Sequence, residues 1–182
     1  MKLDRDAFSE VFMIPLSSAV SGGLTWSKMP RTRGYELKLN GDVAGTLRRP
    51  SFWSSNFLAE TQGGRWTFRR GGFLGTGAEI VDTVSEQQIA TLKSVWAGGG
   101  TLTFADGQTF HMECHGWWHP VWSVTTGNAE TVVRLHVREK TVDLPSGRVV
   151  PGARLSLLIL FACYRVLQAE EDAASAAAAI AS

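Results

Sequence analysis

The strongest hydrophobic pattern in the chain is an apolar run near its C-terminus, Leu155–Leu167. Its large apolar residues fall on every side of a helical wheel, so no face is left for water. A helix that is apolar all round is buried in protein or in lipid. The run from Leu155 to Tyr164 is shorter than the about 20 residues needed to cross a bilayer. The pattern therefore predicts a helix that is buried inside the protein.

Almost everything before this run alternates between apolar and polar residues with a period of two, which is typical of half-buried strands. The strand signals recur at intervals of about 8 to 12 residues, the spacing of a sandwich or a barrel. The predicted strands cover residues 24–29, 35–39, 43–48, 52–61, 65–69, 79–84, 88–95, 101–104, 108–115, 121–126, 131–138 and 141–144.

Glycine-containing pairs mark the predicted hairpin turns. Asn40-Gly41 and Asp106-Gly107 have the chemistry of type I′ turns, in which both central residues take a positive φ. A further hairpin is predicted across Gly127-Asn128.

Twelve strands and one apolar helix together predict a filled barrel. Eight strands are filled by their own side chains and sixteen leave a channel, so about twelve would leave a void that close packing forbids. The helix, about 10 Å across, fits that void. We therefore expect a mostly β fold, a closed antiparallel β-barrel of about 12 strands around a central hydrophobic C-terminal helix at about 153–170. Residues 1–23 form an arm or a short helix, 24–170 the barrel with its helix, and 171–182 an alanine-rich tail, helical or frayed.

The N-terminal residues and the cysteines bear on the compartment. Phe8, Val11 and Phe12 have the spacing of a short amphipathic helix, but charged residues with no apolar segment after them do not form a secretory signal. Cys114 and Cys163 do not make a disulfide framework, and we interpret both as buried free thiols. These features favour the cytoplasm. The net charge of +1 gives no overall attraction to nucleic acid or membrane.

The sequence also resembles a known family. Gly45-Thr-Leu-Arg-Arg-Pro50, Gly64-Arg-Trp-Thr-Phe-Arg-Arg-Gly-Gly-Phe73 and Gly99-Gly-Thr-Leu-Thr-Phe-Ala-Asp-Gly107 are similar to uncharacterised bacterial members of the tubby C-terminal-like group, which includes LURP-one-related and scramblase-like proteins. The resemblance covers about residues 24–168 and implies a closed barrel around a central helix. Tubby binds phosphoinositide headgroups through basic residues on its exterior, and scramblase-like members associate with membranes. Neither family's ligand motif can be matched here residue by residue, so neither activity is carried over.

Basic residues are concentrated in the first 75 positions, where the charge balance is +5. Arginine beside aromatic residues suits phosphate recognition. The candidate ligand-binding residues are Arg48, Arg49, Arg65, Arg69, Arg70 and Trp53, within a wider set that adds Lys28, Arg31, Arg33, Lys38, Trp26 and Trp66. An anionic lipid headgroup or a phosphorylated small ligand is the predicted partner, which leaves a peripheral membrane location open. A solvated face with scattered charge is the alternative, and nucleic acid is not favoured.

One strand could also hold a metal ion. His111, Glu113 and His115 alternate, so their side chains point to one face, and His119 follows near the next turn. Two imidazoles and a carboxylate are zinc-type ligands, although an ordinary polar outer face explains the same pattern.

Other features of the sequence favour structure over chemistry. Trp117, Trp118 and Trp122 around Pro120 predict core or interface packing, with a stacking platform as the alternative. Arg165, on the apolar helix, is expected either to reach the mouth of the barrel or to pair with an interior carboxylate.

No nucleophile elbow or phosphate-binding glycine loop is present, and no cofactor is indicated. The sequence thus favours a non-catalytic binding or scaffold module. The alternatives are an interaction module without a small ligand, with an unidentified protein partner, and a metal-dependent enzyme at His111/Glu113/His115.

Overall fold

The structure is a computed structural model that describes residues 13–16, 23–29, 34–51, 54–71, 77–95, 99–146 and 150–181. Its elements are β1 (Leu24–Lys28), β2 (Gly34–Leu39), β3 (Asp42–Arg48), β4 (Phe57–Thr61), β5 (Gly64–Gly71), β6 (Gly77–Asp82), β7 (Gln88–Ser94), β8 (Gly100–Phe104), β9 (Thr109–His115), β10 (Val121–Thr126), β11 (Thr131–His136), β12 (Thr141–Asp143) and α1 (Gly152–Ala181).

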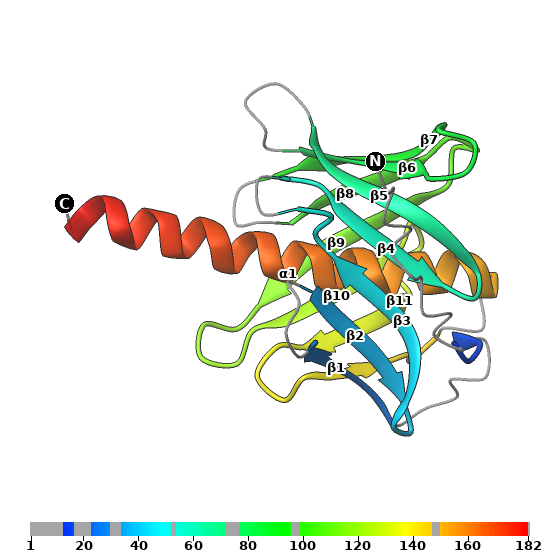
Figure 1. The fold of residues 1–182 in the computed structure, drawn as a ribbon, viewed down its shortest axis with the longest axis horizontal. Coiled ribbons are helices and arrows are strands. Elements are labelled where there is room, and N and C mark those ends of the chain that lie inside the picture. The colour runs from blue at the N-terminus through cyan, green and yellow to red at the C-terminus, as the bar shows by residue number, and fades with distance from the viewer. Residues whose placement is uncertain are drawn as a thin grey trace, which may run out of the picture.

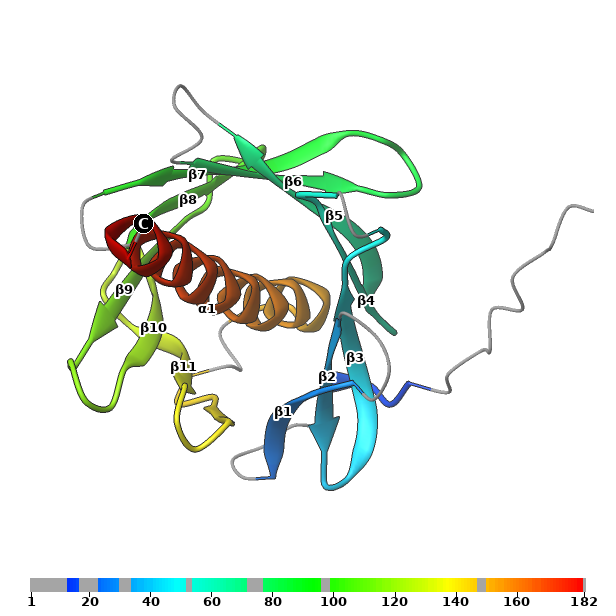
Figure 2. The same cartoon turned by 60° about the vertical axis from the view of Figure 1, so that its left-hand side comes forward.

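The strands form one closed antiparallel barrel around α1, so the predicted fold class is confirmed (Figures 1 and 2). Each strand pairs with its neighbours in the sequence, and β1 closes the ring by pairing with β12 through Thr25 and Thr141. Trp26 N also donates to Lys140 O at 3.0 Å across this seam. Closure leaves no strand edge open to another chain.

The strand boundaries match the predicted ones to within two residues except in one place. The strand predicted over 52–61 begins only at Phe57. The preceding residues Ser54–Asn56 form a turn, in which Asn56 N donates to Ser54 Oγ at 3.1 Å. Residues 52 and 53 lie outside the described part of the chain.

One of the two predicted type I′ turns differs from expectation, and the hairpin predicted across Gly127-Asn128 is present between β10 and β11. Asn40 (φ 54°) and Gly41 (φ 97°) both have positive φ, as a type I′ turn requires. At Asp106-Gly107 only the glycine does (φ 85°), and Gly107 N donates to Phe104 O at 2.9 Å. This is a three-residue loop, a type I turn followed by one left-handed residue. The β10–β11 loop repeats that geometry with Ala129 (φ 60°) in the left-handed position.

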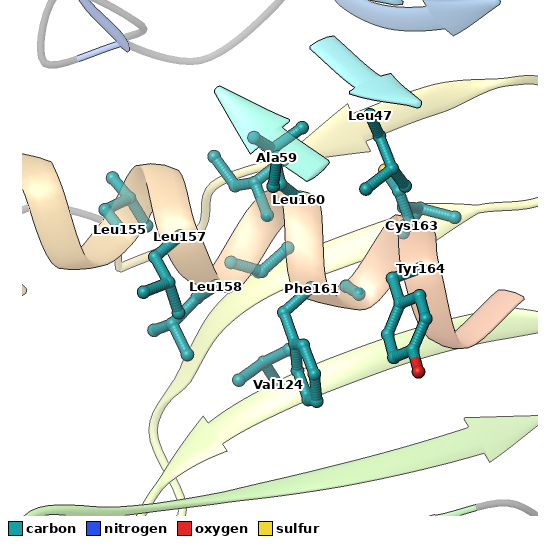
Figure 3. Packing of buried hydrophobic residues seen from close by; sticks show 14 of the residues in the cluster. Leu47, Ala59, Val124, Leu155, Leu157, Leu158, Leu160, Phe161, Cys163 and Tyr164 are labelled. Carbon is teal, nitrogen blue, oxygen red and sulfur yellow. The ribbon is translucent and has the colours of Figure 1, made fainter. Parts of the chain in front are cut away.

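Helix α1 runs through the barrel, and its side chains fill the interior (Figure 3). Every residue from Leu155 to Gln168 is buried, so the helix has no solvent-facing side over this length. Phe161 is fully buried, with its ring centroid 5.2 Å from that of Phe68 and 5.6 Å from that of Tyr164. The N-terminal segment adds Leu16, which is 3% exposed.

The helix is longer than the predicted span of 153–170. It continues as a regular helix to Ala181, so of the two alternatives for the alanine-rich tail the structure has the helical one. The segment Gly152–Ile180 is long and apolar enough to cross a membrane. However, 78% of its most apolar window is buried inside the protein, as in the core helix of a barrel.

The contacts of α1 define two ends of the barrel. Near its start, Arg154 lies 2.8 Å from Asp106 Oδ2 and donates to Gln108 Oε1 in the β8–β9 connection. We call this end the base. The exposed part of α1 leaves the barrel at the opposite end, which we call the mouth (Figure 1). The β8–β9 connection lies at the base, so β9 runs from the base to the mouth. Because neighbouring strands are antiparallel, all odd-numbered strands run in this direction.

The two cysteines differ in burial. Both are free thiols. Cys163 on α1 is buried, and desolvation raises its pKa to about 12. Cys114 on β9 is only half-buried, so the prediction that both thiols are buried holds for Cys163 alone. Desolvation also raises the pKa of Cys114.

A thiol-labelling experiment should separate the two cysteines. In the native protein near pH 8 we expect a disulfide reagent such as DTNB to label Cys114 slowly and to leave Cys163 unmodified, because Cys163 is inaccessible and almost wholly protonated. In denaturant both should react. The Cys114→Ser variant should show no native-state labelling, and equal labelling rates for both native thiols would contradict the burial of Cys163.

Candidate anion-binding rim at the mouth of the barrel

Two Arg-Arg pairs meet at one part of the mouth. Arg48-Arg49 ends β3 and Arg69-Arg70 lies near the end of β5, with β4 between these strands. Strands two positions apart in a sheet are separated by about 10 Å. We call Arg48, Arg49, Arg69 and Arg70 the arginine rim. The structure thus brings together four of the five arginines that the sequence nominated.

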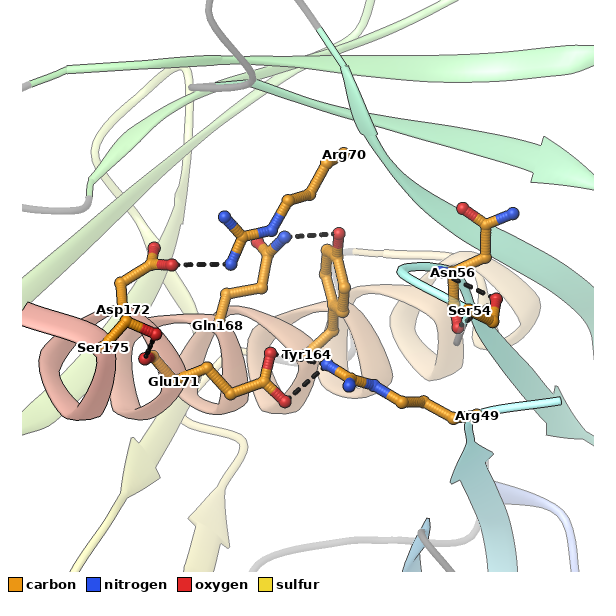
Figure 4. A network of polar contacts seen from close by, with 9 residues as sticks. All are labelled: Arg49, Ser54, Asn56, Arg70, Tyr164, Gln168, Glu171, Asp172 and Ser175. Carbon is orange, nitrogen blue, oxygen red and sulfur yellow. Dashed lines mark hydrogen bonds and ion pairs between the residues drawn. The ribbon is translucent and has the colours of Figure 1, made fainter. Parts of the chain in front are cut away.

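The inner members of the rim contact the helix (Figure 4). Arg49 Nη2 donates to both carboxylate oxygens of Glu171 at 2.5 Å, and the guanidinium lies 4.7 Å from the centre of the Phe57 ring. Arg70 Nη2 donates to Asp172 Oδ1 at 2.7 Å. This bond is the largest cause of the raised pKa of Arg70. The two acidic residues therefore fix the helix where it leaves the barrel.

A buried polar network lies beneath these ion pairs. Gln168 Nε2 donates to Tyr164 Oη at 2.6 Å, and Arg165 Nη1 donates to Gln168 Oε1 at 2.7 Å. Arg165 Nη2 also lies 3.5 Å from Ser94 Oγ at the end of β7. Burial raises the pKa of Tyr164 to about 12 and lowers that of Arg165. Of the two predicted placements for Arg165, the structure favours the mouth, where its hydrogen bonds go to an amide and a hydroxyl.

The outer members of the rim face solvent. Side chains alternate along β5, so Arg65 and Arg69 point outward while Arg70 points to the interior. Arg48 lies 3.9 Å from Glu60 Oε2, and Arg65 Nε donates to Glu60 Oε1 at 2.6 Å. Arg65 lies nearer the base than Arg69 and shares the Glu60 carboxylate with Arg48, so it borders the rim on the base side. Arg69 makes no ion pair within the described part of the chain. Trp53, also nominated, lies outside the described residues.

The ion pairs of the rim are open to competition. The Arg70–Asp172 pair is the most exposed, with side chains 36% and 63% exposed, and exposed pairs contribute only about 0–1 kcal/mol. Arg49 and Glu60 are less exposed, at 20% and 21%. A phosphate group, which accepts bidentate hydrogen bonds from arginine, can replace a carboxylate there at small cost.

The candidate metal residues are not gathered around one point. His115 Nε2 lies 3.2 Å from Glu113 Oε2, and both side chains are about two-thirds exposed. His111 Nδ1 instead lies 3.2 Å from Thr101 Oγ1 on β8. Among the described residues no three His, Cys, Asp or Glu side chains could hold a metal ion together. The positions of these side chains therefore lend the metal-site interpretation no support.

The three tryptophans around Pro120, predicted to lie in the core or at an interface, have different environments. Trp122 on β10 is 3% exposed and belongs to the core. Trp117 and Trp118, in the connection between β9 and β10, are 90% and 82% exposed, so core packing is the wrong interpretation for these two. We call Trp117 and Trp118 the tryptophan tip. It lies at the mouth, since β9 runs in that direction.

Comparisons with known proteins add no relative. No family model, no curated protein and no solved structure matches the chain.

Sequence reasoning missed two parts of this end of the barrel. Glu171 and Asp172 were assigned to a tail without a role, although an acidic run directly after a buried apolar helix is a signal for the barrel mouth. The exposure of Trp117 and Trp118 also had a signal, because Gly116 and Pro120 bracket them between two strands. Glycine and proline at such spacing mark a connection and not a strand.

Proposed function

We propose that this protein is a non-catalytic binding module of tubby-like fold that recognises a phosphate-bearing anion at its arginine rim. The shared chemistry of the ligand is a phosphate group, carried either by a lipid headgroup or by a phosphorylated small molecule. The observation that carries the proposal is the meeting of Arg48-Arg49 and Arg69-Arg70 at one part of the mouth. A twelve-stranded barrel with a central helix is also the architecture that the family resemblance implies.

The charges around the rim support an anionic ligand. Three of the four rim arginines form ion pairs, Arg48 with Glu60, Arg49 with Glu171 and Arg70 with Asp172, and Glu60 also pairs with Arg65. Glu79 lies opposite Arg69 in the register of β5 and β6. Arg69 is exposed, and no carboxylate lies within ion-pair distance of it in the described part of the chain. Because guanidinium is planar and always charged, it binds phosphate in a fixed bidentate geometry. An incoming phosphate can bind Arg48 and Arg69 on the outer face and compete with the helix for Arg49 and Arg70.

Binding measurements with two phosphate sources test this proposal. We expect Arg48→Ala/Arg69→Ala to weaken binding about tenfold, because each loses a charge-assisted hydrogen bond. The probes are inositol hexakisphosphate for a soluble ligand and vesicles of phosphatidylcholine with phosphatidylserine for a lipid. Binding of either probe should weaken as salt is added, since salt screens exposed charges.

Arg134 provides the matched control. It is an exposed arginine on the outer face of β11, away from the rim, so Arg134→Ala removes the same charge without touching the site. Equal affinities of the Arg48→Ala/Arg69→Ala and Arg134→Ala variants for both probes would refute a specific rim. Absence of binding to either probe by the unmodified protein would refute the proposed function.

A further inference from the structure

The tryptophan tip exposes two neighbouring indoles that nothing in the described structure covers. Of the described residues, Trp26, Trp66 and Trp122 are at most 5% exposed, whereas Trp117 and Trp118 are 90% and 82% exposed. Each aromatic side chain of this kind buries about 150–250 Å² when it packs. Two adjacent indoles in water therefore mark an interaction surface.

The backbone around the tip is fixed, so the exposure does not come from a loose loop. Gly116 has φ +84°, and a Cβ there would lie 2.7 Å from His119 O, so only glycine fits. Arg138 Nη1 donates to His119 Nε2 at 3.2 Å, and His119 Nδ1 lies 3.5 Å from Glu139 Oε1. Val137 N donates to Pro120 O at 3.1 Å. The β9–β10 connection is thus tied to the β11–β12 connection and holds both indoles out.

The mouth carries other features that suit a lipid surface. The arginine rim lies on β3 and β5, about half-way round the barrel from the tryptophan tip on β9 and β10. Between them α1 projects out of the barrel (Figure 1). Its exposed segment Ala173–Ile180 has no charged residue, and Ile180 is 87% exposed. Val95, 63% exposed, follows the end of β7 at the same mouth. At the base, three connections centre on the polar or glycine pairs Asn40-Gly41, Asp106-Gly107 and Gly127-Asn128, and the one large apolar side chain exposed there among the described residues is Val84 in the β6–β7 connection.

The uncharged segment is long enough to enter a bilayer. The eight residues Ala173–Ile180 extend about 12 Å at 1.5 Å per residue, which reaches well into the hydrocarbon of one leaflet. The acidic residues Glu170–Asp172 precede this segment and lie level with the rim, where lipid headgroups would be. Tryptophan, with an apolar body and a polar N–H, is enriched at that interface.

We propose that the mouth of the barrel docks end-on onto a lipid bilayer. Trp117 and Trp118 anchor it in the interfacial region, the arginine rim contacts anionic headgroups, and the uncharged end of α1 enters the leaflet. The preference for anionic lipid in this inference rests on the proposed function. Of the two phosphate sources considered there, the inference selects the lipid headgroup. The anchor itself rests on the tryptophan tip and on the helix.

Vesicle binding by matched variants tests the anchor. The full chain is mixed with vesicles of phosphatidylcholine alone and with phosphatidylserine added, and the bound fraction is measured by flotation. We expect Trp117→Ala/Trp118→Ala to lower the partition coefficient by at least about tenfold, because the lost apolar area is large. Ile180→Asp should also lower it. Val84→Ala is the control, since Val84 is 84% exposed at the base, in the β6–β7 connection. Thermal melts confirm that all variants are folded.

A depth measurement gives a second readout. Brominated lipids should quench part of the tryptophan fluorescence of the unmodified protein and clearly less in Trp117→Ala/Trp118→Ala, because both exposed indoles are then gone while Trp26, Trp66 and Trp122 stay inside the barrel. Unchanged vesicle binding and quenching in this variant would overturn the docking inference while leaving the proposed function intact. Binding of inositol hexakisphosphate without vesicle binding would also overturn the docking inference and leave the proposed function intact. Vesicle binding that requires Trp117 and Trp118 but is unchanged in Arg48→Ala/Arg69→Ala would support the tryptophan anchor and contradict lipid binding by the arginine rim.

Discussion

Removal of residues 152–182 is expected to abolish cooperative folding of the barrel. Eight large apolar side chains of α1 are buried, and at about 1.5–3 kcal/mol each they contribute about 12–24 kcal/mol as an upper estimate. They are Leu155, Leu157, Leu158, Ile159, Leu160, Phe161, Val166 and Leu167. This exceeds the net stability of a typical domain, about 5–15 kcal/mol. A twelve-stranded ring without its helix would enclose a void that its own side chains cannot fill.

A shorter deletion is the matched control for this experiment. Removing residues 174–182 takes away helix that is exposed from Ala174 to Ile180 and keeps Glu171 and Asp172 with their arginine partners. This protein should melt cooperatively near the temperature of the full chain, as followed by circular dichroism. A sharp melt of the longer deletion would show that the strands form a stable barrel by themselves.

The barrel could be predicted because the strand pattern and the helix pattern of apolar residues occupy separate parts of the chain. Strand residues alternate with a period of two up to Asp143, and the helix is then apolar on all sides, so each element has one compatible environment. The twelve strands appear where the alternation places them. The weakest prediction was the strand before Phe57, where Ser54, Ser55 and Asn56 favour local hydrogen bonds over pairing.

Turn geometry depends on information that a dipeptide does not carry. Asp106-Gly107 resembles Asn40-Gly41 in sequence, yet the Asp106 carboxylate accepts from Gln108 N at 3.0 Å and from Arg154 on α1. These contacts accompany a three-residue loop in place of the two-residue turn. One of the partners is 48 residues away, so no local pattern could have predicted the outcome.

The candidate site was predictable only in part, for a related reason. Alternation from Trp66 and Phe68 already indicates that Arg70 faces inward and Arg69 outward. The meeting of Arg49 with Glu171, 122 positions apart, depends instead on how the helix is rotated inside the ring. That rotation is set by the packing of Phe161 and Tyr164 against Phe57 and Phe68.

Substitution of Phe161 by alanine is expected to cost about 3–5 kcal/mol of unfolding free energy, the range for large-to-small aromatic changes in cores. Phe161 is fully buried and lies edge-on to Phe68 at an interplanar angle of 86°. The helix is held on all sides, so it cannot move to fill the cavity. Urea denaturation, followed by circular dichroism, gives the unfolding free energy, and an unchanged m-value confirms that the compactness of the two states is retained.

Two further variants show whether the loss comes from the ring contact or from burial in general. Ile180→Ala removes an exposed side chain of the same helix and should change stability by less than about 0.5 kcal/mol. Phe68→Ala combined with Phe161→Ala should cost less than the sum of the single changes, because both rings line one cavity and neighbouring residues couple by about 0.5–3 kcal/mol. Strict additivity would mean that the two rings stabilise the barrel independently. A loss below about 1 kcal/mol for Phe161→Ala alone would contradict the tight packing of α1, and with it the view that the helix is the core of the fold.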